Sequence, residues 1–374
     1  MPILRTEQIG RRFDVKQASV VRFYTGPNPG GIWDAALDEA ILRVTCEDHG
    51  PLTVRVWLNK SPVLVLPRSP MQKEGAFIQE CSTRGIHVTR GLSGRRCLLH
   101  GPSVLSFSLV DESNALASGD LEREICQLLS PVIRGIQSEI PTSEIAFDQG
   151  HVIVGESIVG AFNTSYYFDY LMLQGVVHVH SNQHFTTLKI TKEGTRLTCL
   201  DQIQSHVSSQ HIMDAIKKSI AQNHGLQMTN MPASVRVTEL MTELHQWKYT
   251  NNDWVYHQLE PLALGRILLE SYLAYPPTNR CREIIAIVDE ISKKYADKVE
   301  CRKWLRGRGL MSWLKGVPPG LRPSGGVVQA SKKNIVPAVV VQGNITHERK
   351  VPVYDDLCEI VETAYNVTFG GTSE

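Results

Sequence analysis

A short stretch of the chain, residues 90–100, carries most of the side chains that could act on a charged ligand. Arg95 and Arg96 are adjacent guanidinium groups, which can hold a phosphate or carboxylate through paired hydrogen bonds, but a solvated loop edge is an equally good interpretation. Cys97 beside them could be a thiolate nucleophile that accepts an acyl group. Packing is favoured for it, because the sequence CLL is typical of a buried strand. For His100, orienting the loop is favoured slightly over contacting a ligand.

Two further groups could carry chemistry farther along the chain. His178 and His180 alternate with valines, which puts both imidazoles on one strand face, a spacing that metal sites use. Since no acidic or cysteine ligand pattern accompanies them, a polar face without a metal is favoured. Lys189 follows that strand and could reach a pocket, but an exposed surface lysine is the favoured interpretation.

Basic and aromatic residues interleave over residues 301–322, where Trp304 and Trp313 stand among arginines and lysines. Such a mixture can bind nucleic acid or an acidic protein surface. The favoured interpretation is an amphipathic helix whose tryptophans pack on the core. The formal net charge of +1 supports that choice, because the field of the whole protein cannot attract nucleic acid or an anionic membrane strongly.

The elements that position these residues form a strand-rich pattern with interspersed helices. Residues 35–44 have the apolar spacing of a helix and should direct Ala36, Ile41 and Val44 to a core, and residues 121–140 predict a second amphipathic helix. Strands are predicted at 54–58, 63–66, 86–88, 103–110, 151–159 and 175–179. This order predicts an α+β fold rather than a regular βαβ repeat.

Length and composition indicate two domains. A chain of 374 residues is long for one average domain, and 42% apolar residues can bury a sizeable core. After a predicted helix at 211–224, the polar stretch 225–234 lacks periodicity, which places the junction near Ser234. We therefore expect a first domain over residues 1–234 and a small mixed domain over residues 235–374. The second should contain helices at 262–272 and 283–295, with loop and strand over 326–342 and 346–352.

Cysteine usage and hydropathy indicate an intracellular protein. The eight cysteines include no Cys-x-x-Cys pair, and the sequence shows no signal peptide. Arg5, Arg11 and Arg12 give the N-terminus basic character, but Glu7 and Asp14 interrupt it, so a mitochondrial presequence is not favoured. The location is either cytoplasmic or mitochondrial. The longest apolar run is strand-sized, so no membrane span is predicted.

Several stretches resemble, in order and spacing, the motifs of the lipoate-protein ligase family. Residues 61–74 (SPVLVLPRSPMQKE) are similar to the family's Ser-Pro-x-Val-Val-Ile-Gly-Arg-x-Gln-Asn. Residues 90–110 are similar to its Arg-Arg-x-Ser-Gly-Gly-Gly-x-x-Tyr-His-Asp and the strand after it. Residues 155–161 (GESIVGA) resemble the segment with Lys-Ile-Ser-Gly, and residues 244–249 (LHQWKY) the start of an accessory domain. The resemblance implies a biotin/lipoate ligase-like mixed sheet flanked by helices, with a small C-terminal accessory domain.

The motifs depart from the family pattern where chemistry is expected. Arg95 and Arg96 replace loop glycines that let the backbone approach a ligand, and Ser157 replaces the family's lysine. A hydroxyl cannot balance the charge of an acyl-adenylate, so no catalytic residue is named. Gly101 and Pro67 also differ from the motif. The resemblance implies a ligand site made by Arg68, Arg90, Ser93, Gly94, Arg95, Arg96, His100, Ser157 and Gly160.

The family's chemistry gives two hypotheses for this chain. Its members resemble one another in activating lipoate or octanoate with ATP and passing the acyl group to a lysine, and some relatives transfer an acyl group that is already activated. The resemblance thus implies ATP and lipoate or octanoate as substrates, with Mg2+ as a candidate ion. It implies a lipoyl carrier domain of a 2-oxoacid dehydrogenase or glycine cleavage protein as partner. The leading hypothesis is a lipoate-protein ligase-like acyltransferase. The alternative is a non-catalytic descendant that binds a ligand or a protein.

Overall fold

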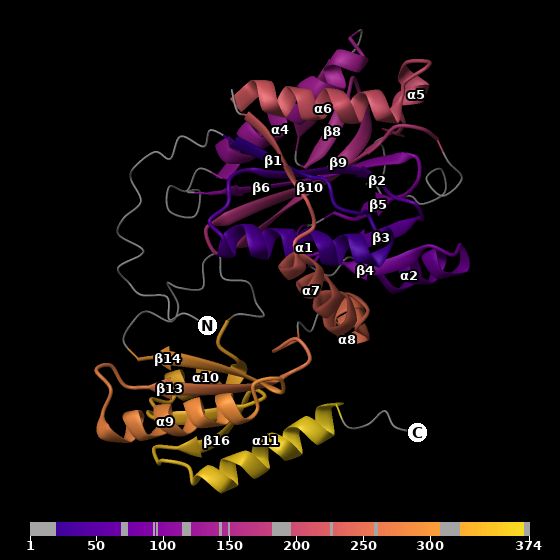
Figure 1. Ribbon diagram of the computed structural model, residues 1–374. Coiled ribbons are helices and arrows are strands. Elements are labelled where there is room, and N and C mark those ends of the chain that lie inside the picture. Colours follow the sequence, from indigo (N-terminus) through magenta and orange to yellow (C-terminus); the bar gives the residue numbers. More distant parts are fainter. Residues whose placement is uncertain are drawn as a thin grey trace.

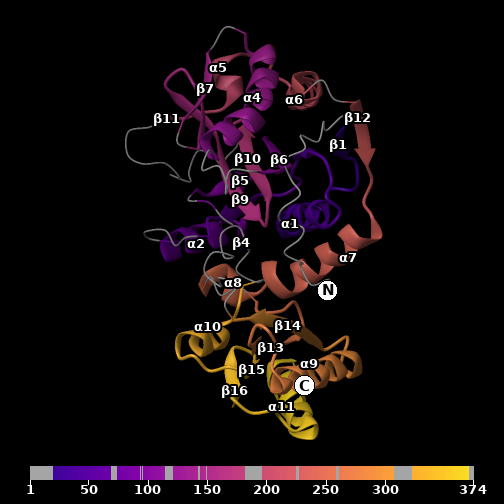
Figure 2. The ribbon, with the colours of Figure 1, turned by 90° about the vertical axis from the view of Figure 1, so that its left-hand side faces the viewer.

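The computed structural model describes residues 20–68, 74–92, 94, 96–113, 121–141, 144–148, 150–181, 196–224, 227–257, 261–306 and 322–369. Within these residues the chain forms a large α+β unit and a smaller unit, which Figure 1 and Figure 2 show from two sides. The predicted α+β class is confirmed. Among the described helices, none combines the length and the apolar character needed to cross a membrane.

A mixed sheet forms the centre of the large unit, with nine strands in the described part of the chain. The order is β12-β1-β2-β6-β10-β9-β8-β7, and β11 lies beside β9. β1 pairs in parallel with β12 and β2, whereas β2, β6, β10 and β9 pair antiparallel. The strands are β1 (Val20–Tyr24), β2 (Thr53–Leu58), β6 (Val104–Glu112), β7 (Ile145–Asp148), β8 (His151–Val154), β9 (Ser157–Tyr167), β10 (Tyr170–His178), β11 (Arg196–Leu197) and β12 (Gln227–Met231).

Helices cover both faces of this sheet (Figure 1). On one face α4 (Leu121–Glu139) and α6 (Ser209–His224) pack their apolar side chains against the strands. On the other face lies α1 (Ile32–Glu47), with α7 (Val235–Leu244) packed on its outer side. The sheet is therefore shielded from water on both faces, which suits its long apolar strands.

Helix α1 is buried over most of its surface because the sheet and α7 enclose it. It directs apolar side chains to the core as its spacing predicts, including Ala36, Ile41 and Val44. The helix also buries three carboxylates, those of Asp34, Asp38 and Glu39. Buried charges must be paired, so these three side chains determine what can pack around the helix.

A three-stranded sheet lies beside the large one and carries the motif stretch 90–100. In it, β3 (Val63–Leu66) pairs in parallel with β4 (His87–Arg90) and antiparallel with β5 (Leu98–His100). Helix α2 (Glu74–Thr83) packs its apolar side chains on this sheet. A short helix, α5 (Leu200–Ile203), follows β11.

The packing of the large unit continues past Ser234. Helix α7, the π-helix η2 (His245–Tyr249) and α8 (Asn252–His257) lie against α1 and β4. The division predicted at Ser234 therefore does not coincide with the packing. The polar stretch 225–234 contains β12, an edge strand whose side chains are mostly exposed, and so its sequence has no alternation to reveal it.

The smaller unit contains a four-stranded sheet in the described residues, ordered β14-β13-β15-β16. Helices α9 and α11 pack on one face of this sheet and α10 on the other. Its elements are β13 (Ile267–Leu273), α9 (Asn279–Lys294), β14 (Val299–Leu305), α10 (Gly325–Lys332), β15 (Ala338–Val341), β16 (Asn344–Glu348) and α11 (Tyr354–Phe369).

Several element predictions are wrong. The helix predicted at 262–272 is the strand β13, which is buried on both faces and so lacks the alternation of a half-buried strand. The strand predicted at 151–159 is a hairpin of β8 and β9, because Gly155 turns the chain with a φ of 57°. The loop predicted from residue 326 is helix α10.

The amphipathic helix favoured for residues 301–322 is also wrong where the structure describes it. Residues 301–305 belong to strand β14. Trp304 nevertheless packs against the core, as favoured, and its Nε1 donates to Glu270 Oε1 at 2.8 Å. Trp313 lies outside the described residues.

The close approach of α4 and α6 generates a stability prediction. A Cβ on Gly135 would lie 2.5 Å from the Cα of Ile216, so Gly135→Ala must push the helices apart. The free energy of unfolding should fall by about 1–3 kcal/mol. The control is Gly75→Ala in α2, where nothing lies within 4 Å of the new Cβ, and which should be neutral or stabilising by about 0.5–1 kcal/mol. Urea denaturation measures both, and equal stability of the two variants would contradict the packing.

Candidate functional site

A cavity opens between the large sheet, the small sheet and the first half of α1. It encloses about 390 Å3, counting the part open to solvent. We call it the α1 cavity. Its described lining residues are Gly31, Asp34, Ala35, Asp38, Trp57, Asn59, Val63, Val65, Gly91, Leu92, Leu98, His100, Gln174 and Tyr249.

The two walls of the α1 cavity differ in polarity. Val63, Val65 and Leu98 make the wall on the small sheet apolar. On the opposite side α1 and β10 present polar side chains, among them Asp38 and Gln174. A ligand with an apolar chain and a polar end would match both walls.

An ion cluster centred on Arg55 underlies the polar wall. Arg55 Nη1 donates to Asp38 Oδ1 at 2.8 Å, and the guanidinium also pairs with Asp34. Ser108 Oγ and Gln174 Nε2 donate to Asp38 at 3.1 and 2.8 Å. Burial raises the pKa of Asp38 above its usual range, while Arg55 opposes that rise. Two carboxylates thus share one guanidinium, which keeps this wall of the cavity acidic.

Trp57 contributes an unsatisfied donor to the α1 cavity. Its ring lies under the Arg55 guanidinium, 3.7 Å from the ring centroid, and stacks near His100 at 6.1 Å. Its Nε1 atom is buried and has no hydrogen-bond partner among the described residues. Buried donors are nearly always paired, so this N–H marks a position where an oxygen of a ligand could accept a hydrogen bond.

A second ion cluster joins α1 to the π-helix η2. Lys248 Nζ lies 3.1 Å from Glu39 Oε2, and the Tyr249 hydroxyl donates to the same oxygen at 2.7 Å. Arg43 pairs with Glu39 from the next turn of α1. Burial would raise the pKa of Glu39, but Arg43 and Lys248 outweigh it and lower that pKa to about 2. The Lys248 ammonium also lies 4.4 Å from the ring centroid of Trp254.

Burial favours the neutral form of His100 and His178, the two buried histidines near the α1 cavity. Burial, aided by Arg55, lowers the pKa of His100 to about 3, and its Nδ1 lies 2.8 Å from Ser106 Oγ. Burial likewise lowers the pKa of His178 to about 3. His180 lies past the end of β10, with Nδ1 3.6 Å from Asp201 Oδ2. In the described part of the chain, no three side chains of the metal-binding types come together.

The arginines of the motifs lie away from the α1 cavity. Arg90 is fully buried, where it pairs with Glu74 and donates from Nε to the Val255 carbonyl at 2.9 Å. Arg68 lies 5.5 Å from the ring centroid of Trp254. Arg96 is directed toward β8, and its Nε donates to His151 Nε2 at 3.2 Å. Of the residues implied as ligand-binding, only His100 lines the α1 cavity among those described.

Among the other residues that the resemblance implies as ligand-binding, the two glycines are required by close backbone packing. Gly94 has a φ of 95°, and a Cβ there would come within 2.1 Å of Asn163, so the loop rests closely on β9. Gly160 packs β9 on β10, because a Cβ would lie 2.2 Å from the Val176 carbonyl oxygen. Ser157 begins β9 and is half-buried. The positions outside the described residues are Ser93, Arg95 and Lys189.

Cys97 is a packing residue, as the sequence favoured. Its side chain is buried in a cluster with Cys81 and Leu99. Burial, with an added effect of Glu74, raises the pKa of the thiol to about 12. A thiolate at neutral pH is therefore disfavoured, which supports packing over the nucleophile hypothesis for this residue.

Sequence reasoning missed the residues that organise the site. The helix predicted at 35–44 rests on its apolar spacing alone, which does not single out Asp34, Asp38 and Glu39. Three acids among the apolar residues of α1 could have indicated buried ion pairs. Lys248 and Tyr249 lie in the LHQWKY stretch, whose π-helical turn has no signature in the sequence. Such π-turns are frequent at functional sites.

Solved structures identify the class of fold. The chain is similar to a lipoate-protein ligase A solved with bound ATP, with a TM-score of 0.55 and 15% identity, covering 65% of this chain and 99% of that one. It is also similar to a bi-partite lipoate protein ligase from Thermoplasma acidophilum, described with its E2 lipoyl domain, with a TM-score of 0.53 and 15% identity, covering 65% and 98%. The chain therefore has the biotin/lipoate ligase-like fold that its motifs imply.

A sequence relative supports the same relationship. Octanoyltransferase LipM from Carboxydothermus hydrogenoformans is 23% identical over 265 residues, which are 63% of this chain and 98% of that protein. No protein-family model matches the chain. The chain is thus related to the lipoate/biotin ligase family, as its motifs indicated, at low sequence identity.

The Glu39 cluster predicts a pH-dependent loss of stability. Glu39→Gln leaves Lys248 and Arg43 without their buried carboxylate, which should cost about 3–5 kcal/mol at pH 7. Because the fold lowers the pKa of Glu39 from 4.5 to about 2, its contribution is complete above pH 4.5 and is lost as the pH falls toward 2. Denaturation from pH 7 to pH 2 should show the gap between wild type and variant closing below pH 4.5.

The control for this prediction is Glu239→Gln on α7. Glu239 is exposed and makes no ion pair among the described residues, so its replacement should change stability little at any pH in that range. A gap between Glu39→Gln and wild type that stays constant down to pH 2 would contradict the assigned ion cluster.

Proposed function

We propose that the chain is a lipoate-protein ligase-like acyltransferase that attaches a lipoyl or octanoyl group to a lysine of a carrier protein. The observation that supports this most directly is the α1 cavity, which combines an apolar wall with a buried unpaired N–H inside a ligase fold. The similarity to lipoate-protein ligases and to an octanoyltransferase supports the same substrate class.

In this proposal the acyl chain lies along the small-sheet wall of the cavity. Val63, Val65 and Leu98 remove its methylenes from water, at about 0.8 kcal/mol for each one buried. The acyl oxygen accepts a hydrogen bond from Trp57 Nε1, which satisfies the buried donor. Because His100 is neutral, it adds no positive charge to this end of the cavity, which suits an uncharged acyl group.

The acyl donor in this proposal is an activated thioester. An acyl-adenylate needs a cation beside its phosphate and carboxyl oxygens. Ser157 supplies none, and the arginines at 90 and 96 are directed to Glu74 and His151. With a thioester, the carrier lysine Nζ attacks the carbonyl carbon. The C–N bond forms, the C–S bond breaks, and the amine proton leaves with the sulfur as a thiol. Activation by ATP with Mg2+, as in a ligase, is the second route.

The acceptor in this proposal is a lipoyl domain of a 2-oxoacid dehydrogenase or of a glycine cleavage protein. The Thermoplasma ligase, which this chain resembles in fold, was described together with its E2 lipoyl domain. The carrier lysine can reach the acyl carbonyl only where the α1 cavity opens to solvent.

Filling the α1 cavity should abolish acyl binding. Val65→Phe places an aromatic ring in the apolar wall and should weaken octanoate binding at least tenfold in calorimetry. The matched control is Val88→Phe, which makes the same substitution at a half-buried position on the neighbouring strand that does not line the cavity. Equal affinity of the two variants would show that the acyl chain binds elsewhere.

The missing cation at Ser157 predicts slow adenylate formation. Such a contact is worth about 3 kcal/mol in the transition state, or roughly a hundredfold in rate. Exchange of pyrophosphate into ATP with octanoate present should therefore stay near background. Ser157→Lys alone should not restore it fully, because the loop arginines remain. Rapid lipoylation of a carrier from ATP and lipoate by the wild-type protein would contradict this and direct attention to Arg95, Arg96 or Lys189.

A further inference from the structure

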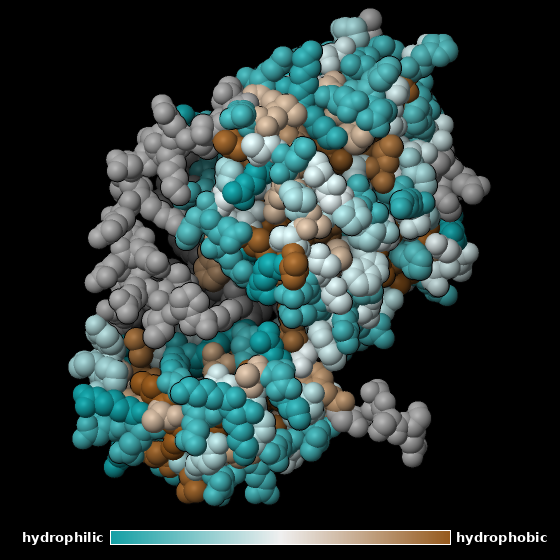
Figure 3. Space-filling model, viewed as in Figure 1, coloured by the Kyte–Doolittle hydropathy of each residue, from teal (hydrophilic) through white to brown (hydrophobic). Residues whose placement is uncertain are grey.

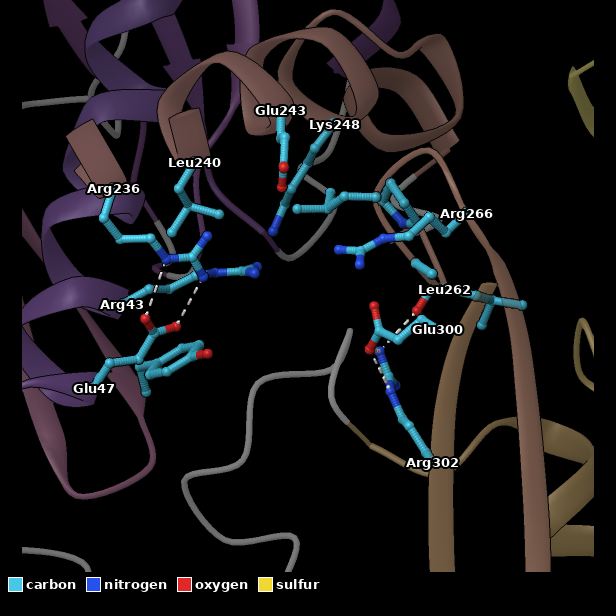
Figure 4. Close-up of a pocket in the computed structure, with 14 residues that line it drawn as sticks. Arg43, Glu47, Arg236, Leu240, Glu243, Lys248, Leu262, Arg266, Glu300 and Arg302 are labelled. Atoms are coloured by element: carbon cyan, nitrogen blue, oxygen red, sulfur yellow. Dashed lines mark hydrogen bonds and ion pairs between the residues drawn. The ribbon is translucent and has the colours of Figure 1, made fainter. Parts of the chain in front are cut away.

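A second recess lies between the large and small units, at the far end of α1 from the α1 cavity. It encloses about 630 Å3, including the part open to solvent, and we call it the interunit groove. Figure 3 shows a hollow between the two units, and Figure 4 shows the side chains that line the groove. Arg43 and Arg236 reach it from the large unit, and Arg266 and Arg302 from the small unit.

Positive charge exceeds negative charge around the interunit groove. Four arginines and Lys248 line it, against Glu47, Glu243 and Glu300. Two of these carboxylates already form ion pairs. Glu47 Oε1 lies 3.4 Å from Arg236 Nη2, and Glu300 Oε1 lies 2.7 Å from Arg302 Nη2. Behind the groove the carboxylate of Glu39 pairs with both Arg43 and Lys248.

Two guanidinium groups on the small unit have N–H donors without an acceptor among the described residues. Arg266 makes no ion pair or side-chain hydrogen bond among the described residues, although it is only half exposed. Arg302 is 9% exposed, and its buried Nη1 has no hydrogen-bond partner in the part of the chain that is described. Burying a guanidinium N–H without an acceptor is unfavourable, so a ligand oxygen that accepts from these groups in the groove would be stabilising.

The geometry brings like charges toward one another. Figure 4 shows Arg43 and Arg266 pointing into the groove from opposite walls, with Lys248 above them. Cations that face one another across a recess favour the binding of a further anion between them. Guanidinium groups present several N–H donors in a plane, which matches the oxygens of a phosphate group.

We propose that the interunit groove binds a phosphate group, held between Arg43 and Lys248 of the large unit and Arg266 and Arg302 of the small unit. Such a ligand would neutralise the facing cations and connect the two units. The site is separate from the α1 cavity. The cavity is lined by residues 31–38 of α1, whereas the groove is lined by Arg43 and Glu47 near its C-terminal end. Leu240 and Leu262 also line the groove and offer apolar surface to the organic part of a phosphate monoester.

The test compares thermal unfolding in phosphate and in chloride at equal ionic strength and pH 8. Wild type should show a saturable rise in Tm with phosphate, as expected for a ligand that binds only the folded state. Arg266→Gln should abolish that rise. It should also leave Tm unchanged or raise it in chloride, because it relieves repulsion and breaks no described ion pair. Arg266→Lys, which keeps the charge but loses the planar donors, should retain a weakened response.

The matched control is Arg282→Gln, at an exposed arginine of α9 outside the groove, which should keep the full phosphate response. Calorimetry should give at least tenfold weaker phosphate binding for Arg266→Gln than for Arg282→Gln. Ethyl phosphate in place of inorganic phosphate separates the sources, since tighter binding of the ester would identify an organic phosphate. Equal responses of both variants, or no phosphate-specific response in wild type, would overturn the proposal.

Discussion

The large unit depends on the pairing of three carboxylates buried on one helix. Asp34, Asp38 and Glu39 of α1 lie between the sheet and α7, where an unpaired charge would cost several kcal/mol. Arg55 of β2 pairs with the first two, and Lys248 of η2 and Arg43 pair with the third. These pairs fix the position of α1 against the sheet. They also fix the π-helical turn against α1, which apolar packing alone would not specify.

The same pairing places the two recesses at opposite ends of α1. The Arg55 cluster forms the acidic wall of the α1 cavity, with Trp57 stacked on its guanidinium. Glu39 stands between the recesses: it accepts a hydrogen bond from Tyr249, which lines the cavity, and it pairs with Arg43 and Lys248, which line the groove. A change of charge in the groove would therefore act on the carboxylate that holds a cavity residue.

The sequence predicts this fold where periodicity and motif order are strong, as in α1, β2, β6 and α6. It fails where burial removes the pattern. The strand β13 is buried on both faces, and the edge strand β12 is mostly exposed, so neither shows the alternation of a half-buried strand. The motif stretch indicates the loop and His100 of the cavity. The motif stretch does not indicate that Arg90 forms an ion pair with Glu74 or that Arg96 donates to His151. The partners in these contacts lie apart in the chain.

The transfer of an acyl group by this divergent ligase fold can be tested directly by mass spectrometry of a lipoyl domain incubated with the protein and an octanoyl thioester. We expect the mass of one octanoyl group to be added on one lysine, and only when the protein is present. If the protein binds octanoate but the lipoyl domain stays unmodified, acyl transfer is contradicted. That result would identify the chain as a non-catalytic ligand-binding descendant of the ligase fold.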